Sequence, residues 1–376
     1  MRIGILTYHH VVNYGAVLQA YALSRFLREL GHHVETIDYR PKKALDAYHK
    51  ALFENNPVEK ENRARAARIE EFVTRHIPLS PERFTTRDGF ARLAGRYEAV
   101  VTGSDEVWNI NSFRGFDPSY FLDFADGARR IAYAASFGYT TTTGKHRDEI
   151  ARLVRAFDAL SVRDSQTQRI LQQECGCSSL KVLDPTLLFA SYDEVAVRPK
   201  ETGFILVYSN PPRKQADFIR RFAEREGKPI IAMAYPMDGA INRLTLSPQE
   251  WIGHFAAADY VFNGFFHGVA FSLIFRKPFT AFSSPDKIVK VSDLLTDMGL
   301  QNRIISDPGP ATPLPESNLD YRPVEPLLAA AVDVSRGFLK SALDETFAGQ
   351  TCVHPPVRHA SLVQQSPAGP GLAQKH

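Results

Sequence analysis

The chain has 376 residues, of which 44% are hydrophobic and 23% are charged, and its formal net charge is +3. This length suffices for two domains, and the small charge gives no indication of a nucleic-acid partner. No apolar run approaches the roughly 18 residues that a membrane-spanning helix requires. The three cysteines are too few for a disulfide framework and lack partners for a zinc site, so we expect a reducing cytoplasm as the location.

The first half of the chain reads as strands alternating with helices. Strands are predicted at 2–8, 32–39, 97–103, 130–138 and 159–164, and helices at 16–30, 147–158 and 165–174. Gly31 ends the first of these helices, and Gly15 falls where the first strand meets it. Because β-strands that alternate with helices form parallel sheets, this half predicts a Rossmann-like domain over residues 1–190.

The second half repeats the pattern. Strands are predicted at 203–209, 228–235, 259–264 and 278–282, and helices at 214–226, 247–258, 267–276 and 290–299, with Ser247 as an N-cap. This predicts a second Rossmann-like domain over residues 191–325, facing the first across a cleft. Residues 326–349 are predicted to form a terminal helix that crosses back to the first domain. Residues 350–376 are rich in Pro, Gly, Ser and Gln and are predicted to be disordered.

Parallel α/β sheets bind ligands outside the carboxyl ends of their strands, so the strand-to-helix junctions are the candidate site. The first junction is "NYGA", where Asn13, Tyr14 and Gly15 begin a helix. Its free N–H groups can face a polar or anionic ligand, but a helix cap with a tight turn fits equally well. The residues alone leave both interpretations open.

The second junction, "TGSDEVWN", follows a buried strand with a polar step at Ser104 and Asp105 and then Trp108 and Asn109. Sugars take hydrogen bonds at their edges and stack their faces on aromatic rings. The junction is therefore a candidate sugar site, and a turn with a buried tryptophan remains an equal alternative.

Two further junctions carry Arg163 and His267. Arg163 in "SVRDS" can present its planar fork to a carboxylate or phosphate, or can pair with the neighbouring Asp164. His267 in "NGFFHG" lies where a strand gives way to a helix, so a phosphate there would also meet a helix N-terminus. A buried, hydrogen-bonded imidazole is the alternative for this histidine.

In order along the chain, "NYGAVLQAYAL", "GSDEVWN", "SVRDS", "VLDPTLLF" and "FFHGVAFSLIFRKPF" resemble the landmarks of the polysaccharide pyruvyl transferase family. The resemblance covers about residues 2–300. It implies a GT-B-like fold of two Rossmann-like domains, and transfer of a pyruvyl group from phosphoenolpyruvate onto a sugar as a ketal. It implies no cofactor beyond this co-substrate and no metal site.

The same resemblance implies the roles of individual residues. His267 is expected to transfer protons during catalysis, because an imidazole can gain or lose a proton near neutral pH. The residues expected to bind the donor are Arg163, Lys287, Gly268 and Phe266. Those expected to bind the acceptor sugar are Asn13, Tyr14, Gly15, Ser104, Asp105, Trp108 and Asn109.

The chain departs from the family pattern at two places. Phe265 and Phe266 precede the histidine where many members carry Asp-Ser or Arg-Leu, and Glu106 replaces a common glutamine. Two alternatives therefore stand beside the transferase: a nucleotide-sugar glycosyltransferase of GT-B type, and a non-catalytic carbohydrate-binding relative. The expected partner is a sugar acceptor, either lipid-linked or nucleotide-linked, which could bring the protein to the inner membrane face. The sequence does not indicate the oligomeric state or the sugar.

Overall fold

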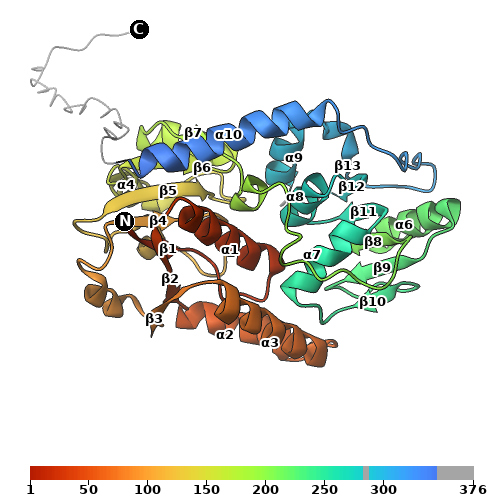
Figure 1. Ribbon diagram of the computed structural model, residues 1–376, viewed down its shortest axis with the longest axis horizontal. Helices are drawn as coiled ribbons and strands as arrows, with labels where there is room; N and C mark the ends of the chain where they lie inside the picture. The colour runs from red at the N-terminus through yellow and green to blue at the C-terminus, as the bar shows by residue number, and fades with distance from the viewer. Residues whose placement is uncertain (283–287, 345–376) are drawn as a thin grey trace, which may run out of the picture.

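The computed structural model describes residues 1–282 and 288–344, which fold into two parallel β-sheets packed against helices (Figure 1). In this part of the chain the first sheet has the strand order β3-β2-β1-β4-β5-β6-β7. Its strands are β1 (Arg2–Leu6), β2 (His33–Tyr39), β3 (Leu79–Phe84), β4 (Ala99–Thr102), β5 (Arg129–Ala135), β6 (Ala159–Val162) and β7 (Leu180–Lys181). The second sheet has the order β10-β9-β8-β11-β12-β13. Its strands are β8 (Ile205–Tyr208), β9 (Ile230–Met233), β10 (Ile241–Arg243), β11 (Tyr260–Asn263), β12 (Phe279–Phe282) and β13 (Ile304–Ile305).

Both sheets reverse their strand order next to their first strand. In the first sheet β1 lies between β2 and β4, and in the second β8 lies between β9 and β11. Crevices at the carboxyl ends of the strands on either side of such a reversal are where open α/β sheets bind ligands. The predicted α/β fold of two Rossmann-like domains is confirmed.

The helices follow the strands as the alternating pattern predicts. The first domain contains α1 (Tyr14–Glu29), α2 (Lys42–Phe53), α3 (Glu59–His76), α4 (Arg147–Val154) and α5 (Ser165–Ile170). The second contains α6 (Arg213–Glu226), α7 (Pro248–Ala257), α8 (Phe266–Ile274) and α9 (Ile288–Asp297). The predicted cap of α7 is confirmed, because the Ser247 side chain accepts from the Glu250 N–H and the Glu250 side chain accepts from the Ser247 N–H.

The sequence analysis predicts no element between residues 40 and 96, whereas the structure places α2, α3 and β3 there. The helix α3 is rich in arginine and glutamate and buries few residues, so its apolar periodicity is weak. The edge strand β3 contains Pro81, exposes its centre, and pairs with β2 through a shifted register. The weak periodicity of α3 therefore hides the helix pattern. The proline and polar residues of β3, which edge strands tolerate, hide the strand pattern.

The two domains are joined by side chains as well as by the chain itself. The Tyr14 hydroxyl donates to the Leu246 carbonyl at 2.7 Å, and its ring stacks on Trp251 with the centroids 5.5 Å apart. The Arg65 guanidinium donates to the Ala234 carbonyl at 2.7 Å. These contacts pack α1 and α3 of the first domain against the second domain.

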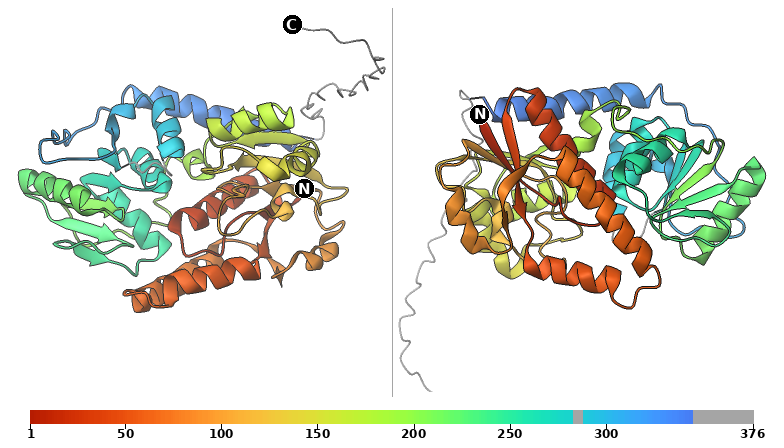
Figure 2. Two further views of the ribbon diagram at one scale, coloured as in Figure 1. Left: turned by 180° about the vertical axis from the view of Figure 1, so that it is seen from behind. Right: turned by 60° about the horizontal axis from the view of Figure 1, so that its bottom comes forward.

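The helix α10 (Val324–Ala342) crosses both domains, as predicted, and runs along one side of the molecule in Figures 1 and 2. At its start Glu325 pairs with Arg276 of the second domain at 2.7 Å. Near its end Arg129 of β5 donates to the Ala342 carbonyl at 3.0 Å. The predicted helix extended to residue 349; residues 345–349 and the predicted tail lie outside the described residues.

Among the described helices, none combines the length and apolar character that a membrane crossing requires. Cys175 is a buried free thiol, and Cys177 is buried as well. The reducing compartment expected from the sequence stays a prediction.

Candidate active site

The carboxylate of Asp184 connects the residues of the candidate site. Its Oδ2 accepts from the Ser104 hydroxyl and from Arg163 Nη1, each at 3.0 Å, and lies 3.4 Å from His267 Nε2. Its Oδ1 accepts from the N–H and the hydroxyl of Thr186, so Asp184 also caps the short 3₁₀ helix Pro185–Leu188. One buried carboxylate thus joins the junctions after β4, β6 and β11.

Asp184 and Arg163 stabilise each other's ionised forms. Burial alone would raise the pKa of Asp184, but the nearby His267 and Arg163 side chains and the hydrogen bond from the Thr186 N–H hold that pKa well below its ordinary range. Burial likewise disfavours the charged guanidinium, and the nearby carboxylates Asp105 and Asp184 raise the pKa of Arg163 above its ordinary value. Asp184 and Arg163 are therefore an ionised pair in a buried environment.

Arg163 is held on three sides. Besides its contact with Asp184, its Nη2 lies 3.4 Å from Asp105 Oδ1, and its guanidinium carbon lies 4.6 Å from the centre of the Phe266 ring. The alternative pairing with Asp164 is not observed, because that carboxylate caps α5 and accepts from the Ser136 hydroxyl at 2.5 Å. Arg163 therefore faces the site rather than its neighbour in the chain.

His267 is both buried and part of the site. Its residue surface is 8% exposed, and its Nε2 contacts Asp184 at ion-pair distance without hydrogen-bond alignment. A Cβ atom placed on Gly15 would lie 2.0 Å from His267 Nδ1, so the imidazole packs directly against the first turn of α1. A glycine is needed at position 15 because any side chain would displace this ring.

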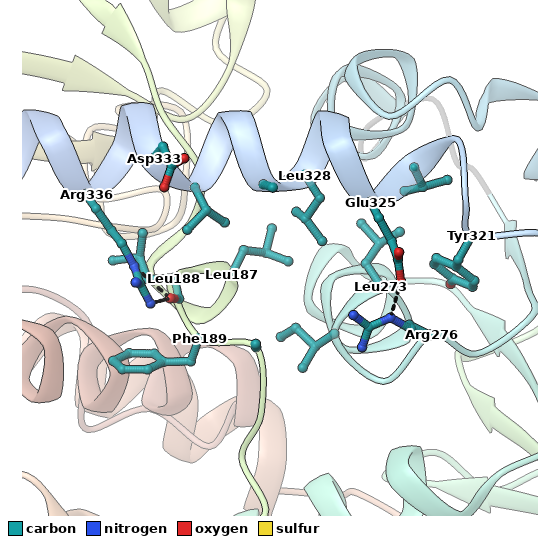
Figure 3. A pocket seen from close by; sticks show the side chains of 15 residues that line it. Leu187, Leu188, Phe189, Leu273, Arg276, Tyr321, Glu325, Leu328, Asp333 and Arg336 are labelled. Carbon is teal, nitrogen blue, oxygen red and sulfur yellow. Dashed lines mark hydrogen bonds and ion pairs between the residues drawn. The ribbon is translucent and has the colours of Figure 1, made fainter.

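A cavity of about 330 Å³ opens beside the cluster and is lined by Arg163, Asp184 and Phe266 together with residues of α9 and α10. A second cavity of about 280 Å³ lies under α10 and is mainly apolar (Figure 3). There Arg336 donates to the Leu188 carbonyl, and Arg276 pairs with Glu325. The lining of this second cavity includes none of the predicted site residues, so it is separate from the cluster.

Trp108, which is predicted from the sequence as a sugar platform, lies inside the first domain in this structure. Its side chain is 1% exposed, its ring stacks on Phe121 at 5.1 Å with a 7° interplanar angle, and its indole N–H donates to the Tyr120 carbonyl. Phe137 and Phe157 contact it as well. Trp108 is a core residue of the first domain, which the sequence analysis had kept as the alternative.

The other residues expected to bind the acceptor are divided between exposed, interdomain and buried positions. Asn13 is exposed and caps α1 by accepting from the Ala16 N–H at 3.2 Å. Tyr14 is buried in the domain contact, so it is not open to a sugar. Asn109 is buried and donates to Glu106 at 2.7 Å. The part-exposed Asp105 lies beside Arg163, Ser104 donates to Asp184, and Gly15 packs against His267, so these three adjoin the cluster.

Of the other three residues expected to bind the donor, the structure describes two, Phe266 and Gly268. Phe266 begins α8 and packs its ring under the Arg163 guanidinium. A Cβ atom on Gly268 would lie 2.4 Å from Asn263 Oδ1, so this glycine allows α8 to pack closely on β11. Lys287 lies outside the described residues.

The sequence analysis missed three residues of this region: Asp184, Glu106 and Lys290. Asp184 stands in the quoted landmark "VLDPTLLF", where an aspartate before a proline is the signal of a capped helix start. Glu106 was noted as a departure but was given no role. Lys290 forms an ion pair with Glu106 from the opposite domain, and no local pattern indicates such a contact.

The described residues contain no group of three or more His, Cys, Asp or Glu side chains placed to hold a metal ion. Charged side chains at the candidate site include Arg163, Asp184 and Asp105.

A model of the polysaccharide pyruvyl transferase family matches residues 13–286 of the chain. No curated protein shows significant sequence similarity to it. Among solved structures, Anabaena Alr3699/HepE in complex with UDP aligns with a TM-score of 0.46 at 12% identity, covering 90% of this chain and 95% of that chain. The spinosyn forosaminyltransferase SpnP aligns with a TM-score of 0.45 at 12% identity, covering 91% and 95%. The UDP-GlcNAc 2-epimerase from Neisseria meningitidis aligns with a TM-score of 0.45 at 8% identity, covering 93% and 96%.

Proposed function

The chain belongs to the polysaccharide pyruvyl transferase family, and we propose that it transfers the enolpyruvyl group of phosphoenolpyruvate onto a sugar, forming a pyruvate ketal. The observation that carries this proposal is the buried cluster in which Asp184 joins Arg163 to His267. It supplies a fixed cation for an anionic donor and an imidazole for proton transfer at the same place.

The donor carries a carboxylate and a phosphate, and both need cationic or N–H partners. Arg163 is suited to such a group because its planar fork can donate two parallel hydrogen bonds. The first turn of α8 adds free backbone N–H groups close to His267, which favour an anion. No further cofactor enters this proposal.

The proposed reaction needs three proton transfers and the departure of one phosphate. The first sugar hydroxyl forms a bond from its oxygen to C2 of the donor, its proton passes to a base, and C3 gains a proton from the His267 imidazolium. The bond between C2 and the bridging phosphate oxygen then breaks, and inorganic phosphate leaves. The second hydroxyl adds to C2 and loses its proton, which closes the ketal. His267 suits this role because an imidazole carries or releases a proton near neutral pH.

We place the acceptor on the first domain, near Asp105 and Glu106, whose side chains are partly exposed beside the cluster. Trp108 has no part in this placement, since the core encloses it. The acceptor class remains a lipid-linked or nucleotide-linked sugar, and a lipid-linked one would bring the protein to the inner membrane face.

The test is a screen of lipid-linked and nucleotide-linked sugars with phosphoenolpyruvate, in which mass spectrometry detects the gain of one pyruvyl unit with release of inorganic phosphate. The product is expected with the wild type and not with His267→Gln. Binding of a UDP- or GDP-sugar without binding of phosphoenolpyruvate would instead indicate a glycosyltransferase.

A further inference from the structure

Helix α9 of the second domain presents one polar face to the first domain. Lys290 pairs with Glu106, the Asp293 carboxylate accepts from the Ser165 N–H at 2.5 Å, and Asp297 pairs with Lys181 at 2.7 Å. Positions 290, 293 and 297 are three and four residues apart, so they share one face of the helix. This face fixes α9 across the domain contact, with Lys290 in its first turn.

Lys290 is held in a largely buried position. Its side chain is 13% exposed, and burial lowers the pKa of Lys290, an effect that the Asp105 carboxylate opposes. Buried ammonium groups require a close anionic partner, because desolvation otherwise disfavours their charge. In this structure Glu106 is that partner.

Glu106 is itself placed by its neighbours. Its Oε2 accepts from Asn109 Nδ2 at 2.7 Å, while its Oε1 faces Lys290. A Cβ atom on Gly138 would lie 2.4 Å from Glu106 Oε2, so the glycine leaves the space that this carboxylate occupies. The contact with Lys290 is therefore the one that a competing anion can replace without disturbing the Asn109 bond.

Lys290 and Arg163 each contact one of two adjacent carboxylates. Asp105 Oδ1 is 3.4 Å from Arg163 Nη2, Glu106 pairs with Lys290, and Asp105 also interacts electrostatically with Lys290. One cation comes from each domain. A ligand with two anionic groups could contact both cations at once.

We propose that Lys290 is a further donor-binding residue, which exchanges Glu106 for an anionic group of the donor when the donor binds. This inference rests on the proposed function, since it takes phosphoenolpyruvate as the donor. It predicts that Glu106 and the donor compete for one ammonium group. Neutralising Glu106 should then strengthen donor binding, and neutralising Lys290 should weaken it.

If the Lys290–Glu106 pair only held the two domains together, the effects on donor binding would differ. In that case Glu106→Gln and Lys290→Met each remove the same contact, so both should change donor binding in the same direction. The double variant separates the two ideas further. Under competition, Glu106→Gln has no effect once Lys290 has been replaced, because no ammonium group remains to be released.

The experiment is isothermal titration of the full chain with phosphoenolpyruvate and, separately, with inorganic phosphate. Lys290→Met is expected to weaken binding roughly ten- to hundred-fold, the usual effect of losing a charge-assisted contact. Glu106→Gln is expected to tighten binding, and the double variant to match Lys290→Met. Lys214→Met is the control, because it removes a lysine that pairs with Asp307 in the second domain and does not line the cavity beside the cluster; it should bind like the wild type.

Wild-type affinity in Lys290→Met, or weaker binding in Glu106→Gln, would overturn the inference. Melting curves accompany each titration, and if Lys290→Met does not fold, the sign of the Glu106→Gln effect decides the question. Wild-type protein that binds phosphate but not phosphoenolpyruvate would contradict the proposed function, while the phosphate titration would still test Lys290. Wild-type protein that binds neither anion would contradict both.

Discussion

The carboxylate of Asp184 lies 3.4 Å from the imidazole of His267, and the two residues belong to different domains. Asp184 follows the last strand of the first sheet, whereas His267 lies in the first turn of the helix after β11 of the second. The candidate site therefore exists only when the two domains are packed together. Substitutions at this contact should therefore affect the stability of the fold and the turnover of the enzyme to different extents.

Asp184→Asn should destabilise the protein. The amide cannot balance the Arg163 guanidinium, and removing one partner of a buried pair costs about 3–5 kcal/mol. The free energy of unfolding in denaturant is the measurement. Asp193→Asn, at an exposed aspartate, is the control and should stay within about 0.5 kcal/mol of the wild type. Equal free energies of unfolding for Asp184→Asn and the wild type would show that the charge of Asp184 does not stabilise the fold.

The stabilising effect of Asp184 should depend on pH. Its folded pKa lies below its ordinary value, so the folded protein binds this proton more weakly than the unfolded chain does. The stabilisation is then complete above the ordinary aspartate pKa of about 3.9 and is lost as the pH falls towards the folded value. The stability difference between wild type and Asp184→Asn should shrink on acidification. A difference that stays constant from neutral pH into this acidic range would contradict this account.

Gly15→Ala should impair turnover more than stability. The added methyl group would lie 2.0 Å from His267 Nδ1, so the ring must move away from Asp184. Turnover with phosphoenolpyruvate and the melting temperature are measured together. The control is Gly337→Ala in α10, where a Cβ meets nothing within 4 Å and should stabilise the helix by roughly 0.5–1 kcal/mol. Full activity in Gly15→Ala would mean that the position of the His267 ring does not matter.

Trp108→Ala should lower stability by about 3–5 kcal/mol, because it removes a large side chain from an enclosed core. Trp108→Phe keeps an aromatic ring against Phe121 and should lose less. Denaturant unfolding of both variants provides the comparison. A selective rise in the acceptor KM of Trp108→Ala, with unchanged stability, would restore the stacking role that the structure argues against.

His267→Gln should lower kcat by about 10²–10⁴-fold, the usual contribution of a general acid or base. Glutamine keeps some of the volume and hydrogen bonding of histidine, but it cannot carry a proton near neutral pH. The pH–rate profiles of wild type and variant, with donor binding measured alongside, provide the check. Turnover near that of the wild type would make His267 a packing residue at the domain contact.

Much of the fold and part of the site could be predicted from local patterns. The spacing of apolar residues located β1, α1, β11 and α8, and the caps at Asn13 and Ser247 depend on neighbours within three residues. The order of strands and helices was enough to place Arg163 and His267 at the carboxyl ends of parallel strands. The polar helix α3 and the edge strand β3 were missed because their burial follows no strong period.

What the sequence by itself determined, then, is which segments form strands and helices and which polar residues stand where strands end. Tertiary packing decided which of these residues meet. Within the first domain it brought Asp184 to Ser104, 80 positions away, and enclosed Trp108 in the core. Across the domain contact it brought Lys290 to Glu106, 184 positions away. Secondary structure follows from the spacing of residues a few positions apart, whereas these contacts depend on how helices, loops and the two domains pack against one another. No pattern within one segment contains that information.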